Sequence, residues 1–296
     1  MCDRKVFHLT LVTQSILLGL LSALFVGLSV FALAVSSRKT SVAHVIFWAK
    51  LGGISIASIY AVMSGSLSSV TTDQWVQMLL ISLIGVCGYF AYVKALRLGP
   101  VAIVSPIVAC EGLVVILLAV FLAGEYLEIM QWGAVVVTVV GVILATLNTR
   151  GLSGGKFLIS EGPALACFTM VMFGLAVYLL ARLSQDVGWF VPLYVSNTVY
   201  FLSSTPVVLA KGVPWKGLSL KFIAFIALAG ILEIGGFSIF FKGTEIGIIS
   251  LVSASFITHP LVPIAGGMLV FRERLTLSQA VGVVSVLAGI LILFLI

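Results

Sequence analysis

Charged residues are scarce in this sequence. Lys, Arg, Asp and Glu together make up 9% of its 296 residues, whereas 61% of the residues are hydrophobic. A soluble domain carries about 25% charged residues, so this chain has too little polar surface to face water everywhere. The composition therefore excludes a soluble enzyme, a soluble nucleic-acid-binding protein and a disordered chain. It indicates that a lipid bilayer surrounds most of the protein.

The residue types that build metal and catalytic centres are also few and scattered. The three histidines are far apart, and there is neither an HExxH sequence nor a paired aspartate motif. The four cysteines include no CxxC pair, and we interpret them as small apolar packing residues. We therefore predict no metal, no cofactor and no catalytic residue. A membrane-embedded enzyme acting on a lipid or isoprenoid is the alternative function.

The positive charges are spread singly along the chain. The net charge is +6, but the basic residues sit at the ends of apolar runs instead of on one face, which does not favour a nucleic-acid partner. Four of them lie on the face of the N-terminus and eleven on the opposite face. Because cytoplasmic loops carry the excess of Lys and Arg, this count predicts that both termini face outside.

Long apolar runs fill almost the whole sequence. A spanning helix needs about 20 apolar residues, so ten such helices with short turns fit this length. The predicted spans are 9–35, 42–63, 75–97, 100–122, 129–148, 160–182, 190–210, 220–243, 247–270 and 277–296. The first run has 27 residues, longer than the apolar part of a signal peptide, so we interpret it as a retained helix.

The second half of the chain repeats the first after a shift of 148 positions. The polar coincidences are Lys94 with Lys242, Glu125 with Glu273, and Gln131 with Gln279. Such matches rarely arise by chance between apolar runs. We therefore predict two five-helix repeats, 1–149 and 150–296. An odd number of spans inverts the second repeat in the membrane, an arrangement typical of secondary transporters.

The last part of each repeat resembles an EamA domain. Residues 95–144 and 243–291 each carry a small-residue turn, a helix with Ser and Pro, a Glu-bearing turn, a Gln and a Gly-rich last helix. The Glu-bearing turns read Gly124-Glu125-Tyr126 and Arg272-Glu273-Arg274. The resemblance implies the ten-helix branch of the drug/metabolite transporter superfamily, with a central cavity between the halves. It also implies a multi-pass protein of the plasma (inner) membrane, and termini that face inside.

Four ionisable residues lie within predicted spans, where charge is costly and usually functional. They are Lys50, Glu111, Glu233 and His259. Glu111 and His259 are repeat mates, and we expect them to face each other across the pseudo-twofold axis. Such a pair could bind a polar substrate or take up a proton. The alternative is a structural pair that ties the two halves together.

The other two charged residues have polar or aromatic neighbours. Phe237 follows Glu233 by four residues, and a carboxylate beside aromatic rings suits an ammonium ligand. Lys50 could hold a substrate carboxylate, with Asn197 as its approximate counterpart in the seventh span, or its long stem could extend to the interface. Tyr89 and Tyr92 are further candidates for lining the cavity.

Two glutamates have a predicted structural role. Glu125 and Glu273 precede the fifth and tenth spans, where a carboxylate accepts backbone N–H bonds and complements the helix dipole.

Taken together, these patterns predict a secondary transporter, an exporter of a small polar metabolite such as an amino acid or amine. It would work by alternating access between the two repeats, as a monomer or homodimer.

Overall fold

The computed structural model describes residues 2–67, 70–123, 129–146, 160–210, 217–246 and 258–295, with Val252, Ser255 and Phe256. Every long regular element within them is a helix. The bounds are α1 Cys2–Lys39, α2 Val42–Ser64, α3 Thr72–Leu98, α4 Val101–Ala109, α5 Glu111–Ala123, α6 Ile129–Thr146, α7 Glu161–Val187, α8 Phe190–Leu209, α9 Leu220–Ile246, α11 Leu261–Val270 and α12 Leu277–Leu295. The all-helical prediction is confirmed.

Six segments of the described chain are long and apolar enough to cross a membrane, judged by length and composition. The fourth predicted span consists of two helices, α4 and α5, which meet at Cys110. The Cys110 N–H donates to the carbonyl of Ile107, 3.1 Å away and only three residues back. This tightened turn follows Pro106, which lacks an N–H, and it places Glu111 at the start of α5. Most of 247–257 lies outside the described residues.

Local capping explains where several helices begin and end. Thr71 and Gln74 form a reciprocal capping box, so α3 begins at Thr72, three residues before the predicted start. Ser41 accepts the His44 N–H at the start of α2. Helix α7 continues to Val187, beyond residue 182, where the sixth predicted span ends. Gly188 ends the helix with a φ of 78°.

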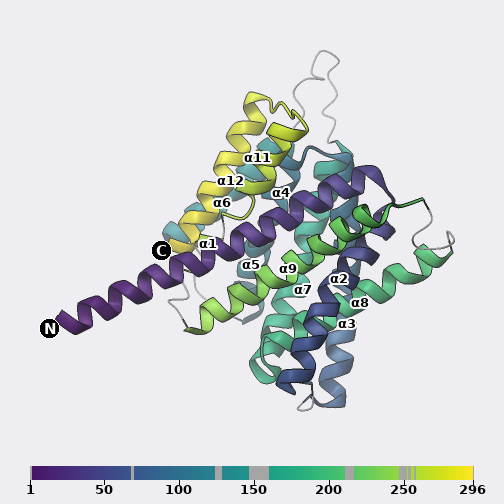
Figure 1. Cartoon of the computed structure of the whole chain (residues 1–296). Coiled ribbons are helices and arrows are strands. Elements are labelled where there is room, and N and C mark those ends of the chain that lie inside the picture. Colours follow the sequence, from purple (N-terminus) through teal and green to yellow (C-terminus); the bar gives the residue numbers. More distant parts are fainter. Residues whose placement is uncertain are drawn as a thin grey trace.

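A stripe of buried serines runs along α1, and one of them bonds to α9. Ser15, Ser22, Ser29 and Ser36 recur every seven residues, and all four are fully buried. The Ser22 hydroxyl donates to the Gly236 carbonyl of α9 over 2.7 Å. Small side chains on one face allow two helix backbones to approach closely in a membrane. Figure 1 shows α1 and α9 running side by side across the molecule.

Glycines allow an equally close approach of α2 and α9. A Cβ at Gly230 would overlap the backbone carbonyl of Ala49, and one at Gly52 would overlap that of Ala227. The contact joins the first half of the chain to the second. It holds the backbones on either side of Lys50 and Glu233 in a fixed relation.

The last helices of the two halves, α6 and α12, also pack through small residues. A Cβ at Gly141 would lie 2.9 Å from the Gly282 carbonyl, and one at Gly289 would lie 3.0 Å from the Ala134 carbonyl. In Figure 1 these helices stand together at one end of the molecule, with α11 and α4 next to them.

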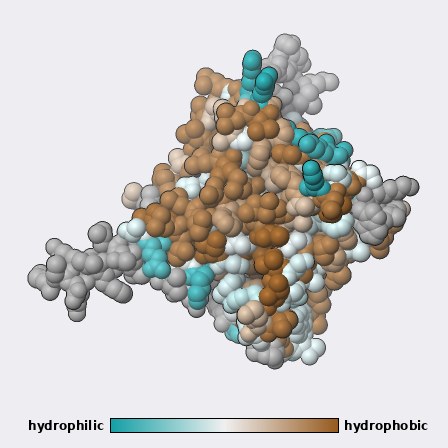
Figure 2. Space-filling model, in the orientation of Figure 1, coloured by the Kyte–Doolittle hydropathy of each residue, from teal (hydrophilic) through white to brown (hydrophobic). Residues whose placement is uncertain are grey.

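The outer surface is apolar. Large side chains such as Val62, Ile129 and Leu277 are more than four-fifths exposed. In Figure 2 hydrophobic residues cover most of the visible face, and hydrophilic residues gather toward its edges. This surface suits lipid rather than water, and the protein is a multi-pass integral membrane protein.

Candidate functional site

Lys50 of α2 is buried and fully engaged. Its side chain is 1% exposed, and its Nζ lies 2.8 Å from Glu233 Oε1 of α9. The same Nζ donates to Asn197 Oδ1 of α8 over 2.9 Å. The ammonium therefore does not extend to the membrane interface. It is held inside the protein by groups from two other helices.

Two tyrosines complete the surroundings of this ion pair. The Tyr89 hydroxyl of α3 donates to Glu233 Oε2 over 2.9 Å. The Lys50 Nζ lies 3.8 Å from the centroid of the Tyr89 ring and 5.3 Å from that of Tyr200 on α8. We call Lys50, Asn197, Glu233, Tyr89 and Tyr200 the ion-pair cluster. Four helices from both halves of the chain contribute to it.

Aromatic rings extend from the cluster on one side. Tyr89 stacks on Tyr200 with the ring centroids 5.1 Å apart. Tyr92 and Phe173 lie next to Tyr89, each with a centroid distance of 6.2 Å. Gly85 of α3 makes room for the Tyr200 hydroxyl, since a Cβ there would overlap it. These rings give the cationic side of the cluster a π-rich wall.

The cluster lies well inside the membrane-spanning region. Lys50 is eight residues from the start of α2 and Glu233 thirteen from the start of α9, or about 12 Å and 20 Å along the helix axes. The hydrocarbon core of a bilayer is about 30 Å thick. At such depth each charge would be costly alone, so the two are tolerated as a pair with further hydrogen bonds.

Among the described residues, Glu111 and His259 do not form an ion pair. Glu111 starts α5, where its backbone carbonyl faces Gly174 of α7.

His259 belongs to a separate aromatic group. It lies in the turn before α11, its Nδ1 is 3.2 Å from the Phe256 carbonyl, and its ring stacks on that of Phe256 at 4.9 Å. Phe237 and Phe240 of α9 also contact the Phe256 ring, at 5.9 Å and 4.6 Å. Phe237 thus packs with His259's neighbours, whereas Tyr89 is the aromatic residue bonded to Glu233.

Glu273 binds backbone N–H groups, but those of a different helix from the one expected. Its two carboxylate oxygens accept the N–H groups of Val101 and Ala102, each over 3.0 Å, and so cap α4. The start of α12 has its own cap, because Thr276 and Gln279 bond each other reciprocally. Glu125 lies outside the described residues.

Glu273 also joins the two halves of the chain at one face of the protein. Arg38, at the end of α1, donates to Glu273 Oε1 over 2.8 Å and to the Gly99 carbonyl over 3.2 Å. Its guanidinium lies 3.6 Å from the centroid of the Phe271 ring. This Arg38–Glu273 contact ties the end of α1 and the start of α4 to the turn between α11 and α12.

Sequence reasoning missed Tyr200 and Arg38. Tyr200 follows Asn197 by three residues, so helical spacing places both on one face of α8, and this signal could have found it. In the sequence, Arg38 contributed only to the charge count that predicts membrane orientation. It lies 235 positions from Glu273, so the sequence does not indicate their contact.

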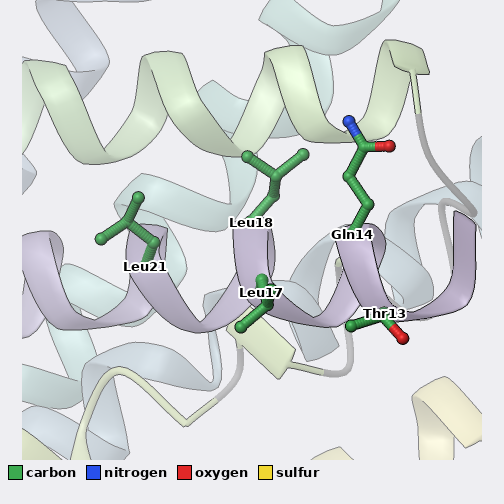
Figure 3. Close-up of a pocket in the computed structure, with 5 residues that line it drawn as sticks. All are labelled: Thr13, Gln14, Leu17, Leu18 and Leu21. Atoms are coloured by element: carbon green, nitrogen blue, oxygen red, sulfur yellow. The ribbon is translucent and has the colours of Figure 1, made fainter. Parts of the chain in front are cut away.

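A shallow hollow lies apart from these residues. It has a volume of about 440 Å³ and is lined by Thr13, Gln14, Leu17, Leu18 and Leu21 of α1. Figure 3 shows that all five side chains come from this one helix. No residue of the ion-pair cluster lines it. Among the described residues there is also no group of three or more His, Cys, Asp or Glu side chains that could hold a metal ion.

Comparison with known proteins finds a likeness to membrane transporters in the first half of the chain. Residues 13–147 match the EamA-like transporter family. Twenty-five solved chains match, among them a crystal structure described only as that of a protein, with a TM-score of 0.60 and 19% identity, covering 95% of this chain and 96% of that one. At this identity the likeness shows the fold. No curated protein matches the chain.

Proposed function

We propose that this chain is a secondary transporter that exports a small polar metabolite, such as an amino acid or an amine. The match of residues 13–147 to the EamA-like transporter family supports a transporter of the drug/metabolite type. The observation that carries the proposal is the ion-pair cluster at mid-membrane depth, built from both halves of the chain. A carboxylate and an ammonium with tyrosine neighbours offer partners to either charge of such a metabolite.

Helix packing supports the further proposal of two inverted repeats, 1–149 and 150–296. A shift of 148 converts α1 into α7 and α3 into α9, and the structure packs α1 on α9 and α7 on α3. The same shift converts the Gly141–Gly282 contact into the Gly289–Ala134 contact. Repeats related in this way can exchange conformations, which opens a central site to each side in turn.

The Arg38–Glu273 contact supports alternating access. It links the end of α1 in the first half to the α11–α12 turn in the second, and the same carboxylate caps α4. We propose that this contact forms when the transporter is closed on the side where it lies and breaks when that side opens.

Transport without ATP is the direct test of this function. We expect the purified protein in liposomes to exchange at least one compound from a panel of radiolabelled amino acids, amines and sugar phosphates, driven by its gradient alone. Empty liposomes and liposomes with heat-denatured protein provide the background. A flux that requires ATP hydrolysis by this chain, or no flux of any compound in the panel, would refute the proposal.

We expect Glu111→Gln and His259→Ala each to lower the transport rate about tenfold, equivalent to about 1.4 kcal/mol in the rate-limiting step. Glu111 is the first residue of α5 and His259 lies in the turn before α11, and a proton or a polar substrate could bind at either residue. Glu111→Gln should also flatten the pH dependence of flux. The matched control is Glu161→Gln in the exposed first turn of α7, which should transport normally. Unchanged rates and pH profiles in both variants would contradict the prediction.

A further inference from the structure

The Lys50–Glu233 pair carries no net charge, and this restricts what can replace it. Lys50 donates to Glu233 and Asn197, and Glu233 accepts from Lys50 and Tyr89. A lone cation that drew Glu233 away would leave the Lys50 ammonium without its counter-ion in a low-dielectric interior. A lone anion on Lys50 would strand the Glu233 carboxylate in the same way. Either event leaves an uncompensated buried charge.

The two members of the pair differ in access. The Lys50 side chain is 1% exposed, whereas that of Glu233 is 17% exposed. An incoming molecule therefore meets the carboxylate first, and its best first contact is a positive group. The rings of Tyr89 and Tyr200 already lie close to the Lys50 ammonium, and rings so placed can also face an ammonium from outside.

From this geometry we propose that the ion-pair cluster selects zwitterions, molecules with both an ammonium and a carboxylate, which bind by taking the place of each partner in the Lys50–Glu233 pair. The substrate ammonium binds Glu233 between the tyrosines, and the substrate carboxylate takes the position that Glu233 leaves on Lys50 and Asn197. No net charge enters the membrane interior, and both protein charges stay paired. The inference rests on the proposed transport function and narrows its substrate from amines and amino acids to zwitterions.

Matched compounds that differ by one charged group test the selectivity. Leucine, isoamylamine and isocaproate form one set, and phenylalanine, phenethylamine and hydrocinnamate form another. Each compound competes with the labelled compound that gives the highest flux in liposomes. We expect the zwitterion of at least one set to inhibit at concentrations at least tenfold lower than its amine or its acid. Equal inhibition by an amine or an acid would overturn the inference and leave the transport function standing.

Ligand-induced thermal stabilisation of the purified protein tests binding without flux. The standard amino acids and glycine betaine are compared with the two amines and the two acids. We expect the largest rise in melting temperature from a zwitterion, and the same order in Glu161→Gln, because Glu161 lies in the exposed first turn of α7, away from the pair. The absence of stabilisation by every zwitterion would overturn the inference. Stabilisation without flux would instead retain the site and refute the transport function.

A charge exchange within the pair gives a second test. Asn197 can donate as well as accept through its amide, and the Tyr89 hydroxyl can do the same, so both suit either order of charges. We expect Lys50→Glu with Glu233→Lys to bind a zwitterion at least tenfold more tightly than either single substitution, since the ligand can bind in the reverse orientation. A folded double variant that binds no better than the single variants would overturn the inference.

Discussion

Replacing Lys50 with methionine should lower the free energy of unfolding by about 3–5 kcal/mol, because it leaves the Glu233 carboxylate buried without its counter-ion. Methionine keeps much of the volume of the lysine stem, so little of the loss comes from packing. Chemical denaturation in detergent micelles measures the change. Transport should fall to background in the same variant, since Lys50 is the cation of the ion-pair cluster.

The double variant Lys50→Met with Glu233→Met separates stability from function. Replacing both members of a buried ion pair with apolar residues is often neutral or stabilising, so we expect most of the lost stability to return. Transport should not return, because neither charge is available to the substrate. Lys94→Met is the matched control, since Lys94 is exposed near the end of α3. A stable and active Lys50→Met variant would show that the pair serves neither role.

The second large effect concerns the contact between α2 and α9. Gly230→Ala should destabilise the protein by about 1–3 kcal/mol, because the new Cβ overlaps the Ala49 carbonyl and forces two helix backbones apart. Ala49 precedes Lys50, and Gly230 lies one turn before Glu233, so the shift changes the geometry of the ion pair. We therefore expect a loss of transport beyond that explained by the amount of folded protein.

Gly235→Ala on the same helix is the control for this prediction. A Cβ at Gly235 would lie 3.6 Å from the Phe25 ring, an ordinary contact. Alanine is favoured over glycine in a helix interior by about 1 kcal/mol, so this variant should be as stable as the wild type or more so. Melting temperature and transport per folded molecule provide the two readouts. Equal behaviour of the two variants would show that α2 and α9 can separate without cost.

Much of the architecture was predictable because it depends on local properties of the chain. The low charge and the long apolar runs determine the solvent, and a chain in lipid must satisfy its backbone hydrogen bonds within helices. Helix positions followed from run length and turn residues. Errors arose where caps or breaks outweighed apolarity, as at Thr71 before α3 and at Cys110 between α4 and α5.

The candidate site was predictable only as a set of residues. Lys50 and Glu233 stood out because charged groups are costly at bilayer depth. Asn197 was the approximate counterpart of Lys50, and Tyr89 was a candidate for lining the cavity. Their mutual contacts did not follow from the sequence. Lys50 and Glu233 are 183 positions apart, and which helix faces which is decided by glycines at the α2–α9 contact.

The proposed repeat symmetry led to two expectations about the tertiary structure. It related α1 to α7 and α3 to α9, and the helix packing follows that relation. It also suggested that Glu111 and His259 would face each other. Among the described residues the two form no ion pair: Glu111 starts α5 with its carbonyl facing Gly174 of α7, and the His259 ring stacks on that of Phe256.

By itself the sequence determined the membrane setting, the helices and which side chains must avoid lipid, because these depend on residue types along one chain. The tertiary structure alone decided that Lys50 pairs with Glu233 and that Glu273 caps α4 instead of α12. A buried charge takes the partner that packing brings within hydrogen-bonding distance. Packing in turn depends on the fit of small residues between helices that are far apart in the sequence.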